Sequence, residues 1–547
     1  MSERRQRLWT VAIALGVALV VVLGTRTARL PDRWYADHSH YRAQVDAFLS
    51  GRLAVATVPE GLRHDLAWTD AGVQQVWGLG VPAWQTPFEA IGRVIGVSPF
   101  PDRVALLGFL ALLFYAVIRA WRDGETRWGR LGVFVIAGLL PAFVTLLRGR
   151  LGVYEEAAAY AYGTAILLAC GTVALHRVPT RRGLWLLVFA AGFTGFVRPT
   201  VWFYGFATLV VASGIWFAHA GTWRRALPAI ALAGGLFVVG GGALYATNAM
   251  RFGAGGEFGH RLNVEDGIPG NIVATRFSYP FQRVGLGEAT TELVSAMFDR
   301  PEQRSRGGHG FYQPNLFGGQ SSVVRWREFY FTAYTWAYVP ILVAALIFGV
   351  IAWLRRRRST DLGASRTRIL AVWAVLGMAP IFAFYLRSPS ISSRYLLDFA
   401  PAVAILLILS WRRLLGALPA RSSSLAFAVL IALWATAVVR ARRHRPRVGS
   451  EPVDRVTAAL STYPRSRPIT YARTLPTAYD LADPLLAEHL ELPTYDRCYA
   501  STGDELDCAV PAVAGDRHLH GERVDLLDET AEHPWRFTLR EVPAAEL

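Results

Sequence analysis

Long apolar stretches recur along most of this chain, and they constrain its fold more than any other feature. A helix that crosses a bilayer needs about 20 mostly apolar residues, and about eleven stretches approach that length. We place them at residues 8–24, 103–120, 131–147, 155–175, 183–198, 200–218, 227–247, 334–354, 369–386, 397–411 and 424–439. The pattern predicts an all-α polytopic membrane protein.

Two of these stretches allow a second interpretation. Arg198-Pro199-Thr200 interrupts the pair near residues 183–218, which therefore forms either two spans or one long re-entrant hairpin. The first stretch follows the basic residues 3–7, and no small-x-small cleavage site follows it cleanly. This favours an uncleaved span over a removable signal peptide.

The charged residues agree with a membrane location. They make up 18% of the chain, whereas a soluble domain carries about 25%. All 57 basic residues are arginine, which leaves a formal net charge of +16. The arginines gather at the ends of the apolar stretches, without the aromatic interleaving of a nucleic-acid surface, so we set nucleic-acid binding aside.

Short basic loops recur at alternate connections and predict the orientation of the spans. They all fall on one side, the cytoplasm, with the N-terminus, at residues 3–7, 119–130, 176–182, 223–225, 355–358 and 412–413. The basic residues 440–447 fall on the other side. That stretch is either an exception to the rule or the sign of one miscounted span.

The outer face then receives the loops 25–102 and 248–333 and a tail, so residues 1–440 form the membrane domain. Residues 451–547 hold 18 of the 41 acidic residues against 9 arginines, and read as a small mixed α/β soluble domain. In an oxidising outer space, Cys498 and Cys508 are expected to form a disulfide.

The first outer loop carries the first candidate site. Tyr41, Val45, Phe48 and Leu49 recur at helical spacing, which predicts an amphipathic helix over residues 38–50 along the membrane interface. Asp37 lies at the start of that helix. It is either a general base for a hydroxyl acceptor or an ordinary helix cap.

A second polar cluster follows at residues 64–82. His64, Asp65 and Asp70 are titratable, and Asp65 is the reserve candidate for the base. Tryptophans 68, 77 and 84 fit either an aromatic belt at the interface or a platform on which a sugar stacks.

Four stretches together resemble a known family: residues 34–53, 64–92, 247–260 and 393–402. One span, an outer loop that opens with Asp37, and an amphipathic helix ending AFLSGRL resemble the start of the GT-C superfamily of integral-membrane glycosyltransferases. The closer resemblance is to the bacterial branch with the RgtA/B/C/D-like and family 39 enzymes. It covers residues 1–440 in outline and does not extend to the tail.

The resemblance implies a GT-C-like helical fold and an enzyme of the bacterial inner membrane. Such an enzyme transfers a sugar from a polyprenyl-phosphate donor to a glycan, lipid or protein acceptor at the outer face. Asp37 would act as the base, and His38, Tyr41 and His64 would contact substrate. The family typically has an Asp-Glu pair where this chain has Asp37-His38.

Arginine side chains are the expected partners of the donor phosphate, because the guanidinium fork matches phosphate oxygens and stays charged. The candidates at outer ends of spans are Arg148, Arg198, Arg251, Arg387 and Arg394. Arg198 and Arg394 are preferred because apolar sequence flanks each, and the alternative role for all five is snorkelling to lipid headgroups.

Two adjacent carboxylates complete the predicted site. Glu155 and Glu156 lie near the outer start of a span, where exposure to lipid would be costly. We therefore expect them to face a cavity and to hydrogen-bond a sugar.

No cofactor other than the lipid-linked donor is expected. His38, His40, His64 and nearby aspartates lack a recognised metal-ligand spacing, so we assign no metal site, although a divalent ion is compatible with these side chains. Two other functions are compatible with this sequence: a carrier or flippase of lipid-linked glycans, and an inactive relative that acts in assembly. A carrier would be expected to contain internal repeats, and none is visible.

Overall fold

The computed structural model of the chain describes residues 34–36, 39–57, 66–121, 127–138, 153–259, 286–298, 324–326, 362–386, 390–392 and 397–443, six strands between residues 469 and 542, and a few single residues. Most of the described residues before 444 are helical. The longer helices are α4 (Asp102–Ala120), α5 (Arg127–Gly138), α7 (Val153–Arg177), α8 (Arg181–Gly192), α9 (Val201–Ala220), α10 (Trp223–Phe252), α14 (Leu362–Leu386), α16 (Ala400–Ala417) and α17 (Ala420–Arg443).

Within the described residues, six segments are long and apolar enough to cross a membrane. They are Asp102–Ala120, Glu155–Arg177, Val201–Ala220, Trp223–Phe252, Arg366–Leu386 and Leu397–Gly416. Their length and hydropathy make this chain a multi-pass membrane protein.

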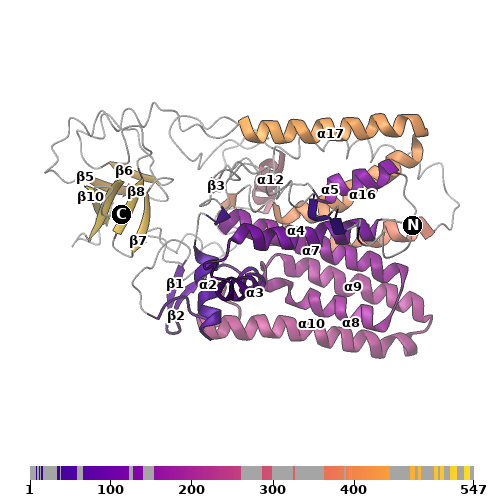
Figure 1. The fold of residues 1–547 in the computed structure, drawn as a ribbon, viewed down its shortest axis with the longest axis horizontal. Coiled ribbons are helices and arrows are strands. Elements are labelled where there is room, and N and C mark those ends of the chain that lie inside the picture. The colour runs from indigo at the N-terminus through magenta and orange to yellow at the C-terminus, as the bar shows by residue number, and fades with distance from the viewer. Residues whose placement is uncertain are drawn as a thin grey trace.

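The other five expected spans do not correspond to any of these six segments. Residues 334–354 lie outside the described residues, and so do most of 8–24 and the second half of 131–147. Residues 183–198 hold the short helix α8, and residues 424–439 lie in α17, whose apolar part is Ser422–Ala432. Helix α17 runs along the bundle (Figure 1).

The doubtful pair near residues 183–218 forms two helices. Helix α8 continues into the 3₁₀ helix η2 (Phe193–Phe196), and α9 starts after a short turn through Pro199. A proline disfavours helical backbone in the residue before it, which explains the break. Gly192 of α8 lies directly against Gly240 of α10, where a Cβ would meet backbone at 2.4–2.6 Å, so these two helices approach closely.

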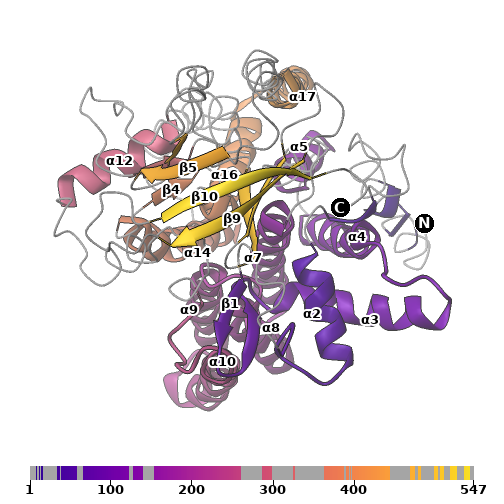
Figure 2. The same ribbon diagram turned by 90° about the vertical axis from the view of Figure 1, so that its left-hand side faces the viewer.

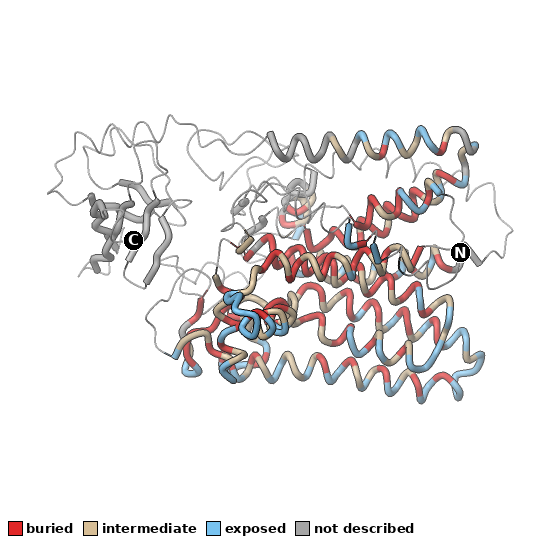
Figure 3. The backbone as a smooth tube through the Cα atoms, viewed as in Figure 1, coloured by how far each residue is buried: buried red, intermediate tan, exposed pale blue. Residues whose placement is uncertain are grey.

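Helix α7 lies at the centre of the bundle and α10 at its edge. Helix α7 packs against α4, α9 and α14, and its buried side chains include Tyr162 and Ile166. The backbone in the middle of the bundle is coloured mostly as buried (Figure 3). Helix α10 exposes a long row of aliphatic and aromatic side chains, among them Val238 and Tyr245. An exposed apolar row on a spanning helix is the expected surface for lipid.

The basic ends of three spans gather at one end of the bundle. The Arg177 guanidinium donates to the carbonyl of Arg119 at 3.0 Å, and Arg366 donates to the carbonyl of Ala120 at 2.8 Å. The end of α4, the end of α7 and the start of α14 are therefore neighbours. This grouping agrees with the alternation of basic loops in the sequence, which assigns this end to the cytoplasm.

Two helices and a hairpin cover the opposite end of the bundle (Figures 1 and 2). They are α2 (His40–Leu49), the antiparallel strands β1 (Leu66–Thr69) and β2 (Gly72–Gln75), and α3 (Gly80–Val94). Helix α2 confirms the helix expected over residues 38–50, and it buries His40, Tyr41, Gln44 and Val45 against the protein. The chain passes from this layer directly into α4, which places the layer at the end of the spans.

Shorter described elements follow in the second half of the chain. They are α12 (Leu286–Phe298), the parallel strands β3 (Val324–Trp326) and β4 (Ser390–Ser392), and the 3₁₀ helix η3 (Leu397–Phe399).

The C-terminal segment contains an antiparallel sheet of six strands in the order β6-β5-β10-β9-β8-β7. The strands are β5 (Ile469–Thr474), β6 (Ala478–Leu481), β7 (Cys498–Thr502), β8 (Glu505–Ala509), β9 (His518–Asp525) and β10 (Trp535–Val542). A mixed α/β domain is expected here, but the elements described in it are all strands. Their β-branched and aromatic residues favour a pleated conformation.

The pairing of β7 with β8 bears on the expected disulfide. Cys498 and Cys508 are directly opposite each other in this antiparallel pair. Opposed residues in such a pair have Cα atoms about 4.5–5.5 Å apart, a separation that a disulfide can bridge. The disulfide itself remains a prediction.

Candidate functional site

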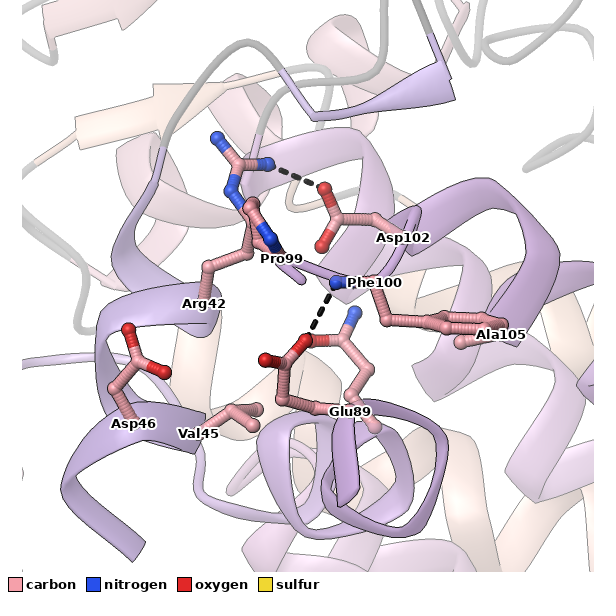
Figure 4. Close-up of a pocket in the computed structure, with 9 residues that line it drawn as sticks. Arg42, Val45, Asp46, Glu89, Pro99, Phe100, Asp102 and Ala105 are labelled. Atoms are coloured by element: carbon pink, nitrogen blue, oxygen red, sulfur yellow. Dashed lines mark hydrogen bonds and ion pairs between the residues drawn. The ribbon is translucent and has the colours of Figure 1, made fainter. Parts of the chain in front are cut away.

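Charged side chains gather where α2, α3 and the start of α4 meet. They line a pocket together with the loop between α3 and α4 (Figure 4). The lining residues are Arg42, Val45, Asp46, Gln85, Glu89, Pro99, Phe100, Asp102 and Ala105. We call this group the carboxylate site.

Asp102 is the buried anchor of the carboxylate site. Its side chain is only 3% exposed, and it forms an ion pair with Arg42 of α2. The same carboxylate accepts a hydrogen bond from the Ala36 N–H at 2.7 Å, while Arg42 donates to the Ala36 carbonyl at 3.1 Å. The Arg42–Asp102 pair thus binds both the N–H and the carbonyl of Ala36. Asp37 is the next residue in the sequence.

Glu89 forms the second anchor, on the buried face of α3. It accepts hydrogen bonds from the Ser98 hydroxyl and the Phe100 N–H at 2.5 Å each, and from Arg93 at 3.2 Å. Burial raises the pKa of this carboxyl, but the hydrogen bonds from Ser98, Phe100 and Arg93 together outweigh it, so the pKa lies below its ordinary value. Glu89 is therefore ionised at neutral pH and fixes the loop before α4.

Glu156 approaches this site from α7. Its side chain is 1% exposed, and one carboxylate oxygen accepts a hydrogen bond from Gln85 of α3 at 2.5 Å. Its other oxygen is buried without a hydrogen-bond partner in the described part of the chain. Glu155 is buried beside it. The two glutamates thus point into protein rather than lipid.

A second cavity lies at the other end of α3, where α10 ends. Its walls come from the segment between β2 and α3, from η2 and the turn after it, and from the end of α10 and the segment that follows it. The residues are Val76, Trp77, Gly78, Leu79, Gly195, Phe196, Pro199, Leu244, Thr247, Asn248, Arg251, Phe252 and Phe258. We call it the arginine cavity, because Arg251 is the charged side chain in its wall.

Arg251 is buried, and no described residue supplies a counter-ion for it. It is 4% exposed, donates to the Gln75 carbonyl, and lies 4.5 Å from the centre of the Phe252 ring. Among the described residues no carboxylate forms an ion pair with it, and its Nε has no hydrogen-bond partner. Burial of a charge in this manner is costly, which makes Arg251 unusual in the molecule.

The start of α3 adds a second attraction for anions in the arginine cavity. Helix α3 begins at Gly80, after the wall residues Gly78 and Leu79, and no side chain caps it. Helix N-termini with free N–H groups attract negative charge. Gly78 packs so closely on η2 that a Cβ would lie 2.3 Å from the Phe196 carbonyl oxygen.

Arg198, one of the two arginines preferred from the sequence, differs from Arg251. Its Nε lies 2.8 Å from a carboxylate oxygen of the buried Asp398, which also accepts a hydrogen bond from Tyr385. Burial lowers the pKa of Arg198, but Asp398 and Tyr385 together outweigh this effect and raise the pKa above its ordinary value. Its charge is thus already neutralised within the protein.

Other residues singled out from the sequence cannot be placed. Asp37, His38, His64, Asp65 and Arg394 lie outside the described residues. Arg148 and Arg387 do so as well. Tyr41 is described and is 2% exposed, in the buried face of α2.

The sequence did not single out Arg42, Gln85, Glu89 or Asp102. Asp102 resembles an ordinary acidic residue in the first turn of a helix, and Glu89 resembles the partner of Arg93 one helical turn away. One signal was available for Asp102, since it adjoins apolar sequence at the end of a span. Polar groups in such positions are often functional.

Metal-ligating side chains do not cluster in the part of the chain that the structure describes. No group of three or more His, Cys, Asp or Glu residues there could hold a metal ion.

No protein-family model matches this chain, and no characterised protein or solved structure is similar enough to count as a match. Its function must therefore be argued from its own residues.

Proposed function

We propose that this chain is a membrane glycosyltransferase that transfers a sugar from a polyprenyl-phosphate donor to an acceptor at the outer face of a bacterial inner membrane. The single observation that carries the proposal is the buried Arg251, which lies in a cavity at the end of a span and has no ion-pair partner in the part of the chain that the structure describes. A lipid phosphate is an anion that reaches such a position along the bilayer.

The lining of the arginine cavity fits one end of such a donor. Arg251 and the start of α3 would hold the phosphate, Asn248 and Thr247 offer hydrogen bonds, and aromatic walls such as Phe258 offer apolar contact. An anion there would supply the charge that Arg251 lacks.

Helix α3 connects the arginine cavity with the carboxylate site. At a rise of 1.5 Å per residue, Gln85 lies about 9 Å along the helix from Leu79, and Glu89 about 15 Å. A sugar on a phosphate in the arginine cavity would thus lie toward the carboxylate site. The acceptor would meet it there.

Asp37 is the proposed base. It follows Ala36, which the Arg42–Asp102 pair holds at the edge of the carboxylate site. The acceptor hydroxyl oxygen attacks the anomeric carbon and gives its proton to the Asp37 carboxylate. The bond between that carbon and the phosphate oxygen breaks, and polyprenyl phosphate leaves as an anion stabilised by Arg251.

Glu156 and Gln85 are assigned to hydrogen bonds with a sugar. Asp65 remains the reserve candidate for the base, and the tryptophans of the outer loop remain a candidate platform for a sugar. The large layer at the outer end of the bundle favours this enzyme over a carrier, whose site would lie near the membrane midplane.

The experiment is sugar transfer by the purified full chain in lipid vesicles. Polyprenyl-phosphate hexoses and pentoses are supplied as donors, and an envelope fraction of the source organism supplies acceptors. Release of free polyprenyl phosphate is measured together with sugar transfer, so that the readout does not depend on knowing the acceptor.

Two substitutions and two matched controls test the roles proposed for Asp37 and Arg251. Asp37→Asn and Arg251→Gln should each abolish transfer. Asp70→Asn, an exposed acid of the β1–β2 turn, and Arg182→Gln, an exposed arginine at the other end of the bundle, should retain it. Full transfer by both Asp37→Asn and Arg251→Gln would refute this mechanism, and no turnover of any donor by the wild type would refute the enzyme.

A further inference from the structure

Helix α3 has its polar side chains inside and its apolar side chains outside. Its buried face carries Gln85 and Glu89, which bond to Glu156 and to the α3–α4 loop. Apart from Arg93, the exposed residues of the helix are all apolar: Ala83, Pro87, Ile91 and Val94. A helix in contact with water has the opposite arrangement.

The apolar face continues around the end of the helix. Val94 is 85% exposed and Ile95 is 62% exposed, and Val97 is exposed on the loop that follows. This loop is folded rather than loose, because the Val97 N–H donates to the Gly92 carbonyl at 2.8 Å and Gly96 turns the chain with a positive φ of 77°. We call Ile91, Val94, Ile95 and Val97 the α3 tip.

The α3 tip projects sideways from the bundle. Figure 2 looks along the spans, and α3 lies across that view, with its C-terminal end extending past α4. In Figure 1, α2 and α3 lie at the end of the spans. The membrane-spanning helix α4 starts at Asp102, only five residues after Val97. The tip is therefore next to the level at which the spans leave the bilayer.

One charged side chain interrupts this exposed surface. Arg93 points toward the protein side, where it forms ion pairs with Asp46 at 2.6 Å and Glu89 at 3.2 Å. Both partners are at the carboxylate site. An arginine held in this way keeps its charge away from the apolar tip.

We infer that the α3 tip is inserted among the acyl chains of the membrane leaflet at this end of the bundle. The occupant of the surface is lipid, because the exposed aliphatic side chains end five residues before a spanning helix, and Gln85 and Glu89 face inward. Helix α3 then lies in the interface as an anchor, independent of the spans. This inference does not depend on the proposed enzyme.

A helix α3 that is anchored in the interface fixes the depth at which both cavities lie relative to the membrane. Gly78 and Leu79, directly before its first residue, form a wall of the arginine cavity, and its buried face forms part of the carboxylate site. Both openings would lie at the headgroup level. The side chains of α3 pack on α4, where the ring centres of Trp84 and Phe109 are 5.8 Å apart. This packing fixes the position of α3 relative to the bundle.

Spin-label accessibility in lipid vesicles tests the inference directly. A nitroxide is attached to Val94→Cys or Ile95→Cys of the full chain, in a background with Cys498→Ser and Cys508→Ser; Cys170 is buried. Val239→Cys on the exposed face of α10 is the control for lipid, and Asp70→Cys in the β1–β2 turn is the control for water. Circular dichroism and gel filtration confirm folding of each variant.

Collision with oxygen is compared with collision with a water-soluble nickel chelate. We expect oxygen to dominate at both tip positions, as at Val239. Dominance of the nickel chelate, as at Asp70, would overturn the inference. Exclusion of both reagents would also overturn it, because a protein surface would then cover the tip. Two independent tip positions keep the result clear if one label disturbs the loop.

Discussion

The buried charged side chains near the two ends of α3 differ in their ion pairing. At the carboxylate site, Arg42 and Asp102 neutralise each other and hold the backbone of Ala36. At the arginine cavity, Arg251 has an equally buried charge and no carboxylate partner in the described part of the chain. The comparison separates charges that hold the fold together from a charge that is free to meet a ligand. The following predictions test that difference.

The largest effect is expected for Asp102→Ala. Removing one partner of a buried ion pair leaves the other charge uncompensated, so unfolding should become easier by about 3–5 kcal/mol. The matched control is Asp46→Ala, whose carboxylate is 60% exposed and pairs with Arg93. An exposed pair contributes about 0.2–1 kcal/mol. Unfolding by SDS titration measures both, and equal effects would contradict the anchoring role of Asp102.

A smaller loss is expected for Gly78→Ala, in the wall of the arginine cavity. The added methyl group would lie 2.3 Å from the Phe196 carbonyl oxygen and 2.4 Å from that of Val197. Forced separation of α3 from η2 should cost about 1–3 kcal/mol. Gly214→Ala is the control, since its Cβ would meet nothing within 4 Å. A Gly78→Ala protein as stable as Gly214→Ala would mean that the contact is loose.

Arg251→Gln should change the stability of the unliganded protein by less than about 1 kcal/mol. The substitution loses a hydrogen bond to Gln75 but also removes an uncompensated buried charge, and these two effects oppose each other. The comparison variant is Arg42→Gln, which should be clearly more destabilising because it leaves Asp102 unpaired. If Arg251→Gln is the more destabilising of the two, then Arg251 serves the fold and the distinction fails.

The smallest effect concerns the pH dependence of the α3–α4 loop. Because the folded pKa of Glu89 is lowered, its stabilising contribution is present above its unfolded value near 4.5 and is lost as the pH falls through the folded value. Glu89→Gln should remove this part of the acid sensitivity, as measured by the unfolding midpoint between pH 6 and pH 3. An identical acid profile for the variant would show that Glu89 does not titrate differently in the fold.

The contrast between Arg198 and Arg251 shows which interactions cannot be predicted from the sequence. Both arginines lie beside apolar sequence at outer ends of spans, and the sequence preferred Arg198. Its partner Asp398 is 200 residues further along the chain, so only the packing of α9, α14 and α16 brings the two together. An ion pair between distant segments leaves no local pattern that could reveal it.

Features set by local sequence were predicted more fully. The membrane class, the positions of the six long apolar helices and the helix after Asp37 follow from apolar runs and helical spacing. The pairing of Arg42 with Asp102 and of Gln85 with Glu156 does not, because those residues are 60 and 71 positions apart. Glu155 and Glu156 were expected to face a cavity, since a bare carboxylate in lipid is costly. Both are buried, but neither is among the lining residues of the two cavities described above.

Titration of the purified chain with polyprenyl phosphate tests the central claim most directly. The thermal unfolding midpoint is followed for wild type, Arg251→Gln and Arg182→Gln, with uncharged polyprenol as the control ligand. We predict that polyprenyl phosphate raises the midpoint of wild type and Arg182→Gln, and that affinity falls about tenfold to a hundredfold in Arg251→Gln, since a charged hydrogen bond contributes about 1.5–3 kcal/mol. Equal affinity in Arg251→Gln, or an equal shift with polyprenol, would contradict a phosphate site at Arg251.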